Sequence, residues 1–202
     1  MSRIFPTLAV AAVVVMLVAF GLGWVIEDAR SIQPDKMSQV SLHMFVGLGA
    51  LVFVSLVHSI VLTYFMGTGR WLEETSKAYS LGDEYFAASK RIKYRTIPLM
   101  VVGIFTLVMV GAIGAMADPA SGSGFTGWFG LDAARTHFAI AATAVVLNLL
   151  IHFIEFQAVR QNGEVINMVL ADVHRIRTER GLPTHPVAGS VTNRPEVVVT
   201  DN

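Results

Sequence analysis

Four histidines are the residues of this sequence best suited to chemistry. His43 and His58 lie 15 residues apart in one apolar stretch, and His137 and His152 lie 15 residues apart in another. The second pair follows the first at a constant offset of 94 residues. An imidazole inside a bilayer is costly unless it faces protein, water or a metal, so four in matched positions indicate a common partner. Imidazole is also the commonest metal ligand in proteins, which makes a metal or a metal-containing cofactor the first candidate.

The composition is that of an integral membrane protein. The chain has 202 residues, of which 53% are hydrophobic and only 15% are charged, and its mean hydropathy is +0.58. These values lie well outside the range of soluble globular domains. The sequence contains no cysteine. Disulfides, iron–sulfur clusters, thiolate metal sites and covalently attached c-type haem are therefore excluded, and any metal must be held by histidine, methionine or oxygen ligands.

Four apolar runs are long enough to cross a hydrocarbon core, which takes roughly 20 helical residues. They extend over about Ile4 to Ile26, Val40 to Phe65, Ile97 to Ala117 and Thr136 to Val159. The first run is longer than the apolar region of a secretory signal, and no convincing cleavage site precedes a soluble domain, so we interpret it as a helix. The sequence therefore predicts an all-α membrane protein built as a four-transmembrane-helix bundle.

Lysine and arginine are shared unevenly between the two sides of these runs, which predicts the orientation. One side carries Arg3, six basic residues between positions 67 and 96, and the basic residues of the C-terminal segment, whereas the other carries only Arg30, Lys36 and Arg135. We expect a multi-pass protein of the bacterial inner (cytoplasmic) membrane with both termini in the cytoplasm.

The polar segments predict short helices outside the bilayer. Residues 67–96 are punctuated by glycine but keep an amphipathic character, which favours one or two short helices at the cytoplasmic interface. Asp132 is a suitable N-cap for the fourth run. Residues 161–181 fit an amphipathic cytoplasmic helix that stops at Gly181, and residues 182–202 are interpreted as an irregular or disordered tail, in which Val197 to Val199 is a short β-prone piece.

The helical rise of about 1.5 Å per residue places histidines 15 positions apart at depths that differ by roughly 22 Å. One ion is too small to join them, whereas two macrocycles stacked across a bilayer match that separation. The second and fourth runs must be parallel, so His43 and His137 share an outer level, and His58 and His152 share an inner one. We therefore predict two haem b groups, each held by two imidazoles, within a transmembrane bundle over residues 1–160.

Glycines provide a second, weaker indication. Counted inward from the ends of the runs, Gly103 falls near the inner level, and Gly21, Gly23 and Gly114 fall near the outer level. Small residues give a flat macrocycle the clearance that it needs beside a helix backbone. Close packing of membrane helices, which favours small residues anyway, explains the same glycines equally well.

This pattern resembles the four-helix haem-binding core of the cytochrome b of quinol-oxidising complexes, which carries two b haems between its second and fourth helices. The resemblance covers roughly residues 4 to 160 and consists of the paired His43 and His58, the paired His137 and His152, and the glycines of the first and third runs. It implies electron transfer, with a quinone and other subunits of a membrane redox complex as partners. No Pro-Glu-Trp-Tyr motif for quinol oxidation is present in the sequence.

Several polar residues have less specific interpretations. Ser55 or Ser59 is a candidate to accept the second N–H of His58, and Arg30, Lys36, Arg135, Arg70 and Arg160 are candidates to bind haem propionates, or else lipid headgroups. We expect Asn148 to form an interhelical hydrogen bond, with a role at a quinone or between the haems as the alternative. Glu155 is expected to pair with a lysine or arginine near the interface, with a proton-accepting role as the alternative.

Three functions remain open at this stage. The leading one is a dihaem electron carrier, a subunit of a respiratory or photosynthetic complex rather than a stand-alone enzyme, in contact with lipid, a quinone and other subunits but not with nucleic acid. The second is a pigment-binding or structural subunit of a membrane complex, for which matched pairs of histidines are unnecessary. The third is a proton or metal transporter, which would favour more acidic residues in the spans than Glu155 alone.

Overall fold

The structure, a computed structural model, describes residues 4–27, 29 and 33–183. These residues form four long helices: α1 (Ile4–Trp24), α2 (Pro34–Tyr79), α3 (Glu84–Ala117) and α4 (Ala133–Glu179), with a short 3₁₀ turn, η1 (Pro119–Ser121), after α3. Each of the four is long and apolar enough to cross a membrane. The prediction of an all-α membrane protein with a four-helix bundle is thus confirmed.

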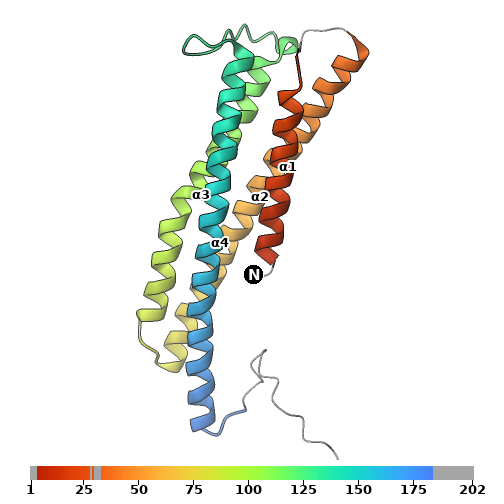
Figure 1. Cartoon of the computed structure of the whole chain (residues 1–202). Helices are drawn as coiled ribbons and strands as arrows, with labels where there is room; N and C mark the ends of the chain where they lie inside the picture. The colour runs from red at the N-terminus through yellow and green to blue at the C-terminus, as the bar shows by residue number, and fades with distance from the viewer. Residues whose placement is uncertain (1–3, 28, 30–32, 184–202) are drawn as a thin grey trace, which may run out of the picture.

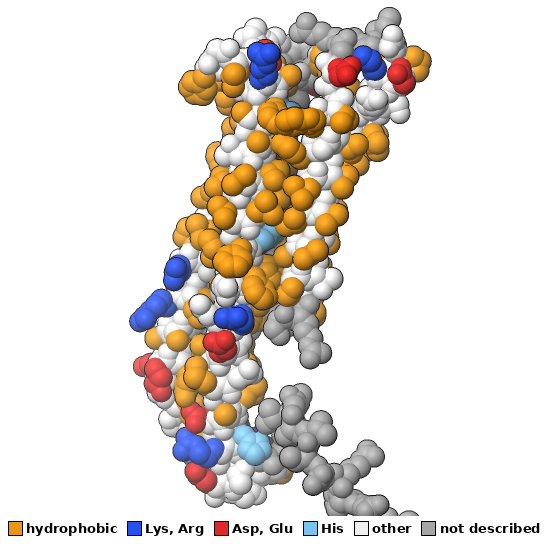
Figure 2. Space-filling model, viewed as in Figure 1, with side chains coloured by type: hydrophobic (Ala, Val, Ile, Leu, Met, Phe, Trp, Pro, Cys, Tyr) orange, Lys and Arg blue, Asp and Glu red, His pale blue; other side chains and the backbone are white. Residues whose placement is uncertain are grey.

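The helices alternate in direction, so α2 and α4 run parallel as predicted. In Figure 1, α1 and α3 ascend while α2 and α4 descend, and the C-terminal end of α1, the N-terminal end of α2 and the α3–α4 connection all lie at the upper end. Figure 2 shows apolar side chains covering the body of the bundle on the viewed face, with charged side chains confined to its upper end and its lower part. This distribution matches a bilayer-spanning body with a polar region at each end.

The helix ends follow local sequence signals. Asp132 caps α4, because its side chain accepts a hydrogen bond from the backbone N–H of Arg135 at 2.8 Å, which confirms its predicted role. The α2–α3 turn passes through Ser80, whose φ of 55° is left-handed. Gly181, with φ of 63°, lies just beyond the end of α4, where the sequence predicts the helix to stop.

The polar segments do not form separate interfacial helices, and this part of the prediction is wrong. Residues 67–79 continue α2, residues 84–96 begin α3, and residues 161–179 continue α4 without a break at 160. All three helices therefore extend beyond the N-terminal end of α1 as a three-helix projection, which we call the stalk (Figure 1). A glycine inside a helix costs about 1 kcal/mol, but α2 continues through Gly67 and Gly69 without a break.

The stalk has its own apolar core and a polar joint to the bundle. Leu72, Val165 and Val169 are buried together and form the core. Above them, the fully buried Asn162 accepts a hydrogen bond from Ser89 of α3 at 2.6 Å. Its amide also donates to Thr68 and Tyr64 of α2 at 3.0 and 3.2 Å, so one side chain ties the three helices together. Residues 184–202, including the β-prone piece 197–199, lie outside the described residues.

Candidate cofactor and metal site

The four histidines face one another inside the bundle, in two pairs between α2 and α4. His43 and His137 form the upper pair, with ring centres 6.2 Å apart and planes inclined at 71°. His58 and His152 form the lower pair, with ring centres 4.7 Å apart and planes inclined at 19°. The prediction that these side chains meet across the bundle at two levels is confirmed, although the two levels differ in their chemistry.

The upper pair is half-buried and only partly hydrogen-bonded. The Nδ1–H of His43 donates to the carbonyl oxygen of Ala19 on α1 at 3.1 Å, which leaves Nε2 of His43 with a free lone pair. The Nδ1 atom of His137 is buried and has no hydrogen-bond partner among the described residues. A histidine that binds a metal through one nitrogen usually donates from the other, and His43 already has this arrangement.

A glycine faces each imidazole of the upper pair. A Cβ atom on Gly23 of α1 would lie 2.8 Å from His43 Cε1, and one on Gly114 of α3 would lie 2.9 Å from His137 Cε1. Both glycines were placed at this level from the sequence. Gly21, which was assigned the same role, is exposed and has nothing within 4 Å of its Cβ position, so the structure does not bring it to the histidines.

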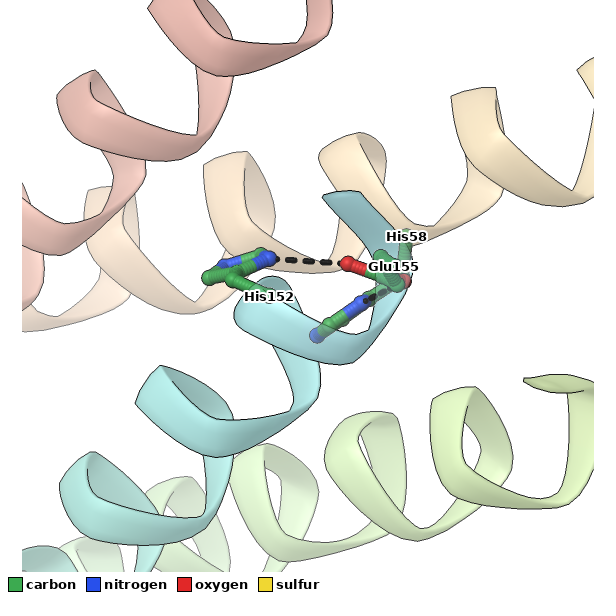
Figure 3. Close-up of side chains that lie close together, drawn as sticks. All are labelled: His58, His152 and Glu155. Atoms are coloured by element: carbon green, nitrogen blue, oxygen red, sulfur yellow. Dashed lines mark hydrogen bonds and ion pairs between the residues drawn. The ribbon is translucent and has the colours of Figure 1, made fainter. Parts of the chain in front are cut away.

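The lower pair is joined by a buried carboxylate. Glu155 accepts a hydrogen bond from Nδ1 of His58 at 2.7 Å through one oxygen and from Nδ1 of His152 at 2.9 Å through the other. In Figure 3, dashed lines join the Glu155 carboxylate to both rings, which lie on the same side of it. The three side chains are at most 4% exposed, and a ligand atom from each lies within 4.8 Å of the others.

Asn148 completes the lower cluster. Its amide donates to the carbonyl of Ala144 at 2.8 Å and to the Thr106 hydroxyl of α3 at 3.2 Å, which sets the orientation of its oxygen. That oxygen accepts from Nε2 of His58 at 3.0 Å, so Glu155 and Asn148 together engage both ring nitrogens of His58. The predicted interhelical hydrogen bond of Asn148 is confirmed.

Gly103 allows α3 to approach this cluster closely. A Cβ atom there would lie 3.0 Å from Asn148 Oδ1 and 3.1 Å from His58 Nε2. The level predicted for Gly103 is therefore confirmed. On the opposite side, the Phe5 ring of α1 lies 6.5 Å from the His152 ring, which keeps the cluster covered from that direction as well.

Two predicted partners at this level are wrong. Glu155 pairs with two histidines rather than with a lysine or arginine, because the helices extend far enough to bury it completely. The ring nitrogens of His58 bond to Glu155 and Asn148, so neither Ser55 nor Ser59 accepts from His58. The signal that the sequence offered is the spacing of His152 and Glu155, three positions apart on one helical face.

The cations considered for haem propionates lie at the surface. Arg135, Arg70 and Arg160 are exposed, and each pairs with an acidic residue three or four positions away, namely Asp132, Glu74 and Glu164, at 3.5, 2.8 and 3.8 Å respectively. Lys36 lies 3.7 Å from Glu27. Arg30 lies outside the described residues. Arg70 lies in the stalk, and Arg160 lies at the junction between the stalk and the rest of the bundle.

The two levels differ in how well they fit a haem with two axial imidazoles. Metal–histidine bonds are about 2 Å long, so imidazoles on opposite faces of one iron have ring centres about 6 Å apart. The ring centres of the upper pair, which lie 6.2 Å apart, match this separation. The lower pair does not fit in this arrangement, because its rings are stacked and both Nδ1 atoms are held by Glu155.

Comparisons of the chain with protein-family models, with curated proteins and with solved structures found no match.

Proposed function

We propose that this chain is a membrane-bound electron carrier of the b type, with haem held by His43 and His137. The observation that carries the proposal is their meeting across the bundle from two parallel helices, with ring centres 6.2 Å apart. The haem would supply one-electron redox chemistry, and the chain would supply its binding and its environment. The resemblance of the histidine pattern to the haem-binding core of cytochrome b supports the same function.

The upper level already contains features that tune a ligated metal. The carbonyl of Ala19 accepts from Nδ1 of His43 and so raises the basicity of Nε2, the nitrogen left free for iron. Gly23 of α1 and Gly114 of α3 carry no side chain at the points where the two helices pass His43 and His137. Half-burial at the end of the membrane-spanning body keeps the site within reach of a partner.

The electron-transfer partners, the membrane and the orientation are proposed from the sequence alone. Electrons would be exchanged with a quinone or with another subunit of a respiratory or photosynthetic complex in a bacterial inner membrane, with both termini cytoplasmic. A second haem at the lower pair, which the sequence also predicts, would require Glu155 to leave both histidines. The geometry thus supports one haem, and the haem-to-protein ratio distinguishes one from two.

The test is a reduced-minus-oxidised absorption spectrum of the chain purified in mild detergent after expression with a haem supply. The proposal predicts a reduced b-type α-band that is lost in His43→Ala and in His137→Ala. His174→Ala, at an exposed stalk position, is the matched control and should keep it. The absence of haem from the wild-type protein, or its retention in both upper-pair variants, would overturn the proposal.

A second candidate, metal or proton transport, gains support from one observation. Glu155 is a fully buried acid that contacts two imidazoles inside the bundle, and such a group is a common element of ion pathways. Transport predicts ion flux into vesicles that contain the purified chain, and this flux should disappear in Glu155→Gln. Pigment binding or a purely structural role predicts pigment absorption or no absorption in the same spectrum.

A further inference from the structure

We propose that His58, His152 and Glu155 bind a single divalent transition-metal ion, separate from any haem at the upper pair. Two imidazoles and one carboxylate are the ligands of many protein-bound zinc and iron(II) ions. Hard cations such as Mg²⁺ and Ca²⁺ prefer oxygen ligands alone, so the nitrogen-rich cluster favours a transition metal. This inference does not depend on the proposed electron transfer.

The distances within the cluster suit coordination. When metal–ligand bonds are about 2.1 Å long, neighbouring ligand atoms at right angles lie about 3 Å apart. The two nitrogen–oxygen distances from Glu155 to His58 and His152 are 2.7 and 2.9 Å, and each histidine uses a different carboxylate oxygen. An ion between these atoms would replace the two N–H donors with lone pairs and use Glu155 through both oxygens.

A supporting shell is present for one of the two imidazoles. His58 donates from Nε2 to the carbonyl oxygen of Asn148, and Asn148 is itself held by Ala144 and Thr106. This arrangement fixes the proton on Nε2 and leaves Nδ1 as the coordinating nitrogen, which is the usual arrangement around a metal-binding histidine. Gly103 allows α3 to pack against this pair, because any side chain there would meet Asn148 and His58 at about 3 Å.

One ring nitrogen of the cluster has no hydrogen bond among the described residues. His152 is 4% exposed and makes a hydrogen bond from Nδ1, but its Nε2 is buried with no partner among the described residues. Buried polar networks in folded proteins are normally complete, because each unpaired group loses its hydration without compensation. An ion held by Nδ1 would leave this nitrogen unpaired, so the ligand set and its distances, and not Nε2 of His152, support the ion.

The direct test measures metal content. The purified chain is stripped with a chelator, reloaded with Zn²⁺, freed of excess ion and analysed by mass spectrometry for zinc per chain. The inference predicts one tightly bound zinc, and its loss in His58→Ala and Glu155→Gln. His174→Ala and Glu164→Gln, which change exposed stalk residues, are the matched controls and should retain it.

A milder variant keeps the inference falsifiable if the direct ones do not fold. Asn148→Ala leaves all three ligands in place and removes only the support of His58, so zinc affinity should fall about 10- to 100-fold while helicity by circular dichroism is retained. No zinc in the wild-type chain, or unchanged affinity in Asn148→Ala together with unchanged zinc in Glu155→Gln, would overturn the inference.

The same samples separate this inference from the proposed function. His43→Ala should lose haem absorption and keep its zinc, and Glu155→Gln should lose zinc and keep haem at the upper pair. A wild-type ratio of two haems per chain, with one lost in His58→Ala, would assign the lower pair to a second haem and overturn the metal-ion inference.

Discussion

Replacement of Glu155 by alanine should strongly destabilise the bundle. Glu155 is fully buried and accepts two charge-assisted hydrogen bonds, at 2.7 Å from His58 and 2.9 Å from His152. Removal of one partner from a buried ion pair costs about 3–5 kcal/mol, because the remaining charge is left uncompensated. That is a large fraction of a typical folding free energy of about 5–15 kcal/mol. We expect Glu155→Ala to lower the free energy of unfolding by this amount.

The assay is equilibrium unfolding in mixed detergent micelles, driven by an increasing fraction of sodium dodecyl sulfate and followed by tryptophan fluorescence. Glu164→Ala is the control, because Glu164 is exposed and its contact with Arg160 at 3.8 Å is worth about 0.2–1 kcal/mol. Glu155→Gln should fall between the two, since the amide keeps one acceptor oxygen. If Glu155→Ala and Glu164→Ala unfold within about 1 kcal/mol of each other, the reasoning about the buried carboxylate is refuted.

Three further predictions concern packing and the stalk. Gly103→Ala should lower the free energy of unfolding by about 1–3 kcal/mol in the same detergent titration, because the new methyl group would lie about 3 Å from two side chains. Gly21→Ala is the control and should not lower the free energy of unfolding, because the space around Gly21 is open. Leu72→Ala should lower the free energy of unfolding by about 2–5 kcal/mol, because it leaves a cavity in the stalk core. The measurement is hydrogen exchange at the C-terminal end of α2, where protection should be lost; unchanged protection would count against a packed stalk. The pKa of Asp172 is held below its usual value first by the Tyr85 hydroxyl and then by Arg175, so its contribution to stability is present above the normal pKa and is lost as the pH falls through the lowered one. Tyr85→Phe should therefore raise the Asp172 pKa in a carboxyl NMR titration, and an unaltered titration would contradict the contact.

The sequence was sufficient to predict the membrane-spanning helices and the pairing of the histidines. Hydropathy locates the spans because a bilayer requires long apolar runs, and alternating topology makes α2 and α4 parallel. Equal spacing on two parallel helices then places their side chains at equal depths. These arguments depend on geometry that every helix shares, so tertiary packing did not alter them.

The stalk could not be predicted, because its evidence lies in contacts between distant segments. Glycines and aromatic residues in 67–96 are also the signals of short interfacial helices, and only packing of Leu72 against α4 favours long continuous ones. The burial of Glu155 was missed for the same reason, namely that the helices were expected to end too early. A span that ends at Val159 places Glu155 near the interface, whereas the extended helices bury it beside two histidines.

The contrast between Gly21 and Gly23 shows that the depth of a residue along a helix does not determine which way the residue faces. The two glycines lie at nearly the same depth, but two helical positions rotate a side chain by about 200°. Gly23 consequently faces His43, and Gly21 faces away from the bundle. Rotation about the helix axis depends on which neighbours pack against α1, and a run that is apolar on every side carries no signal for it.

The most direct test of the central claim is pulsed electron paramagnetic resonance of the oxidised chain, with haem incorporated and all histidines labelled with ¹⁵N. If His43 and His137 bind one iron from opposite sides, the spectrum should show low-spin ferric haem coupled to two ¹⁵N imidazole nitrogens, and His137→Ala should remove that signal. A haem coupled to one histidine or to none, or a two-histidine signal that persists in His137→Ala, would contradict the account.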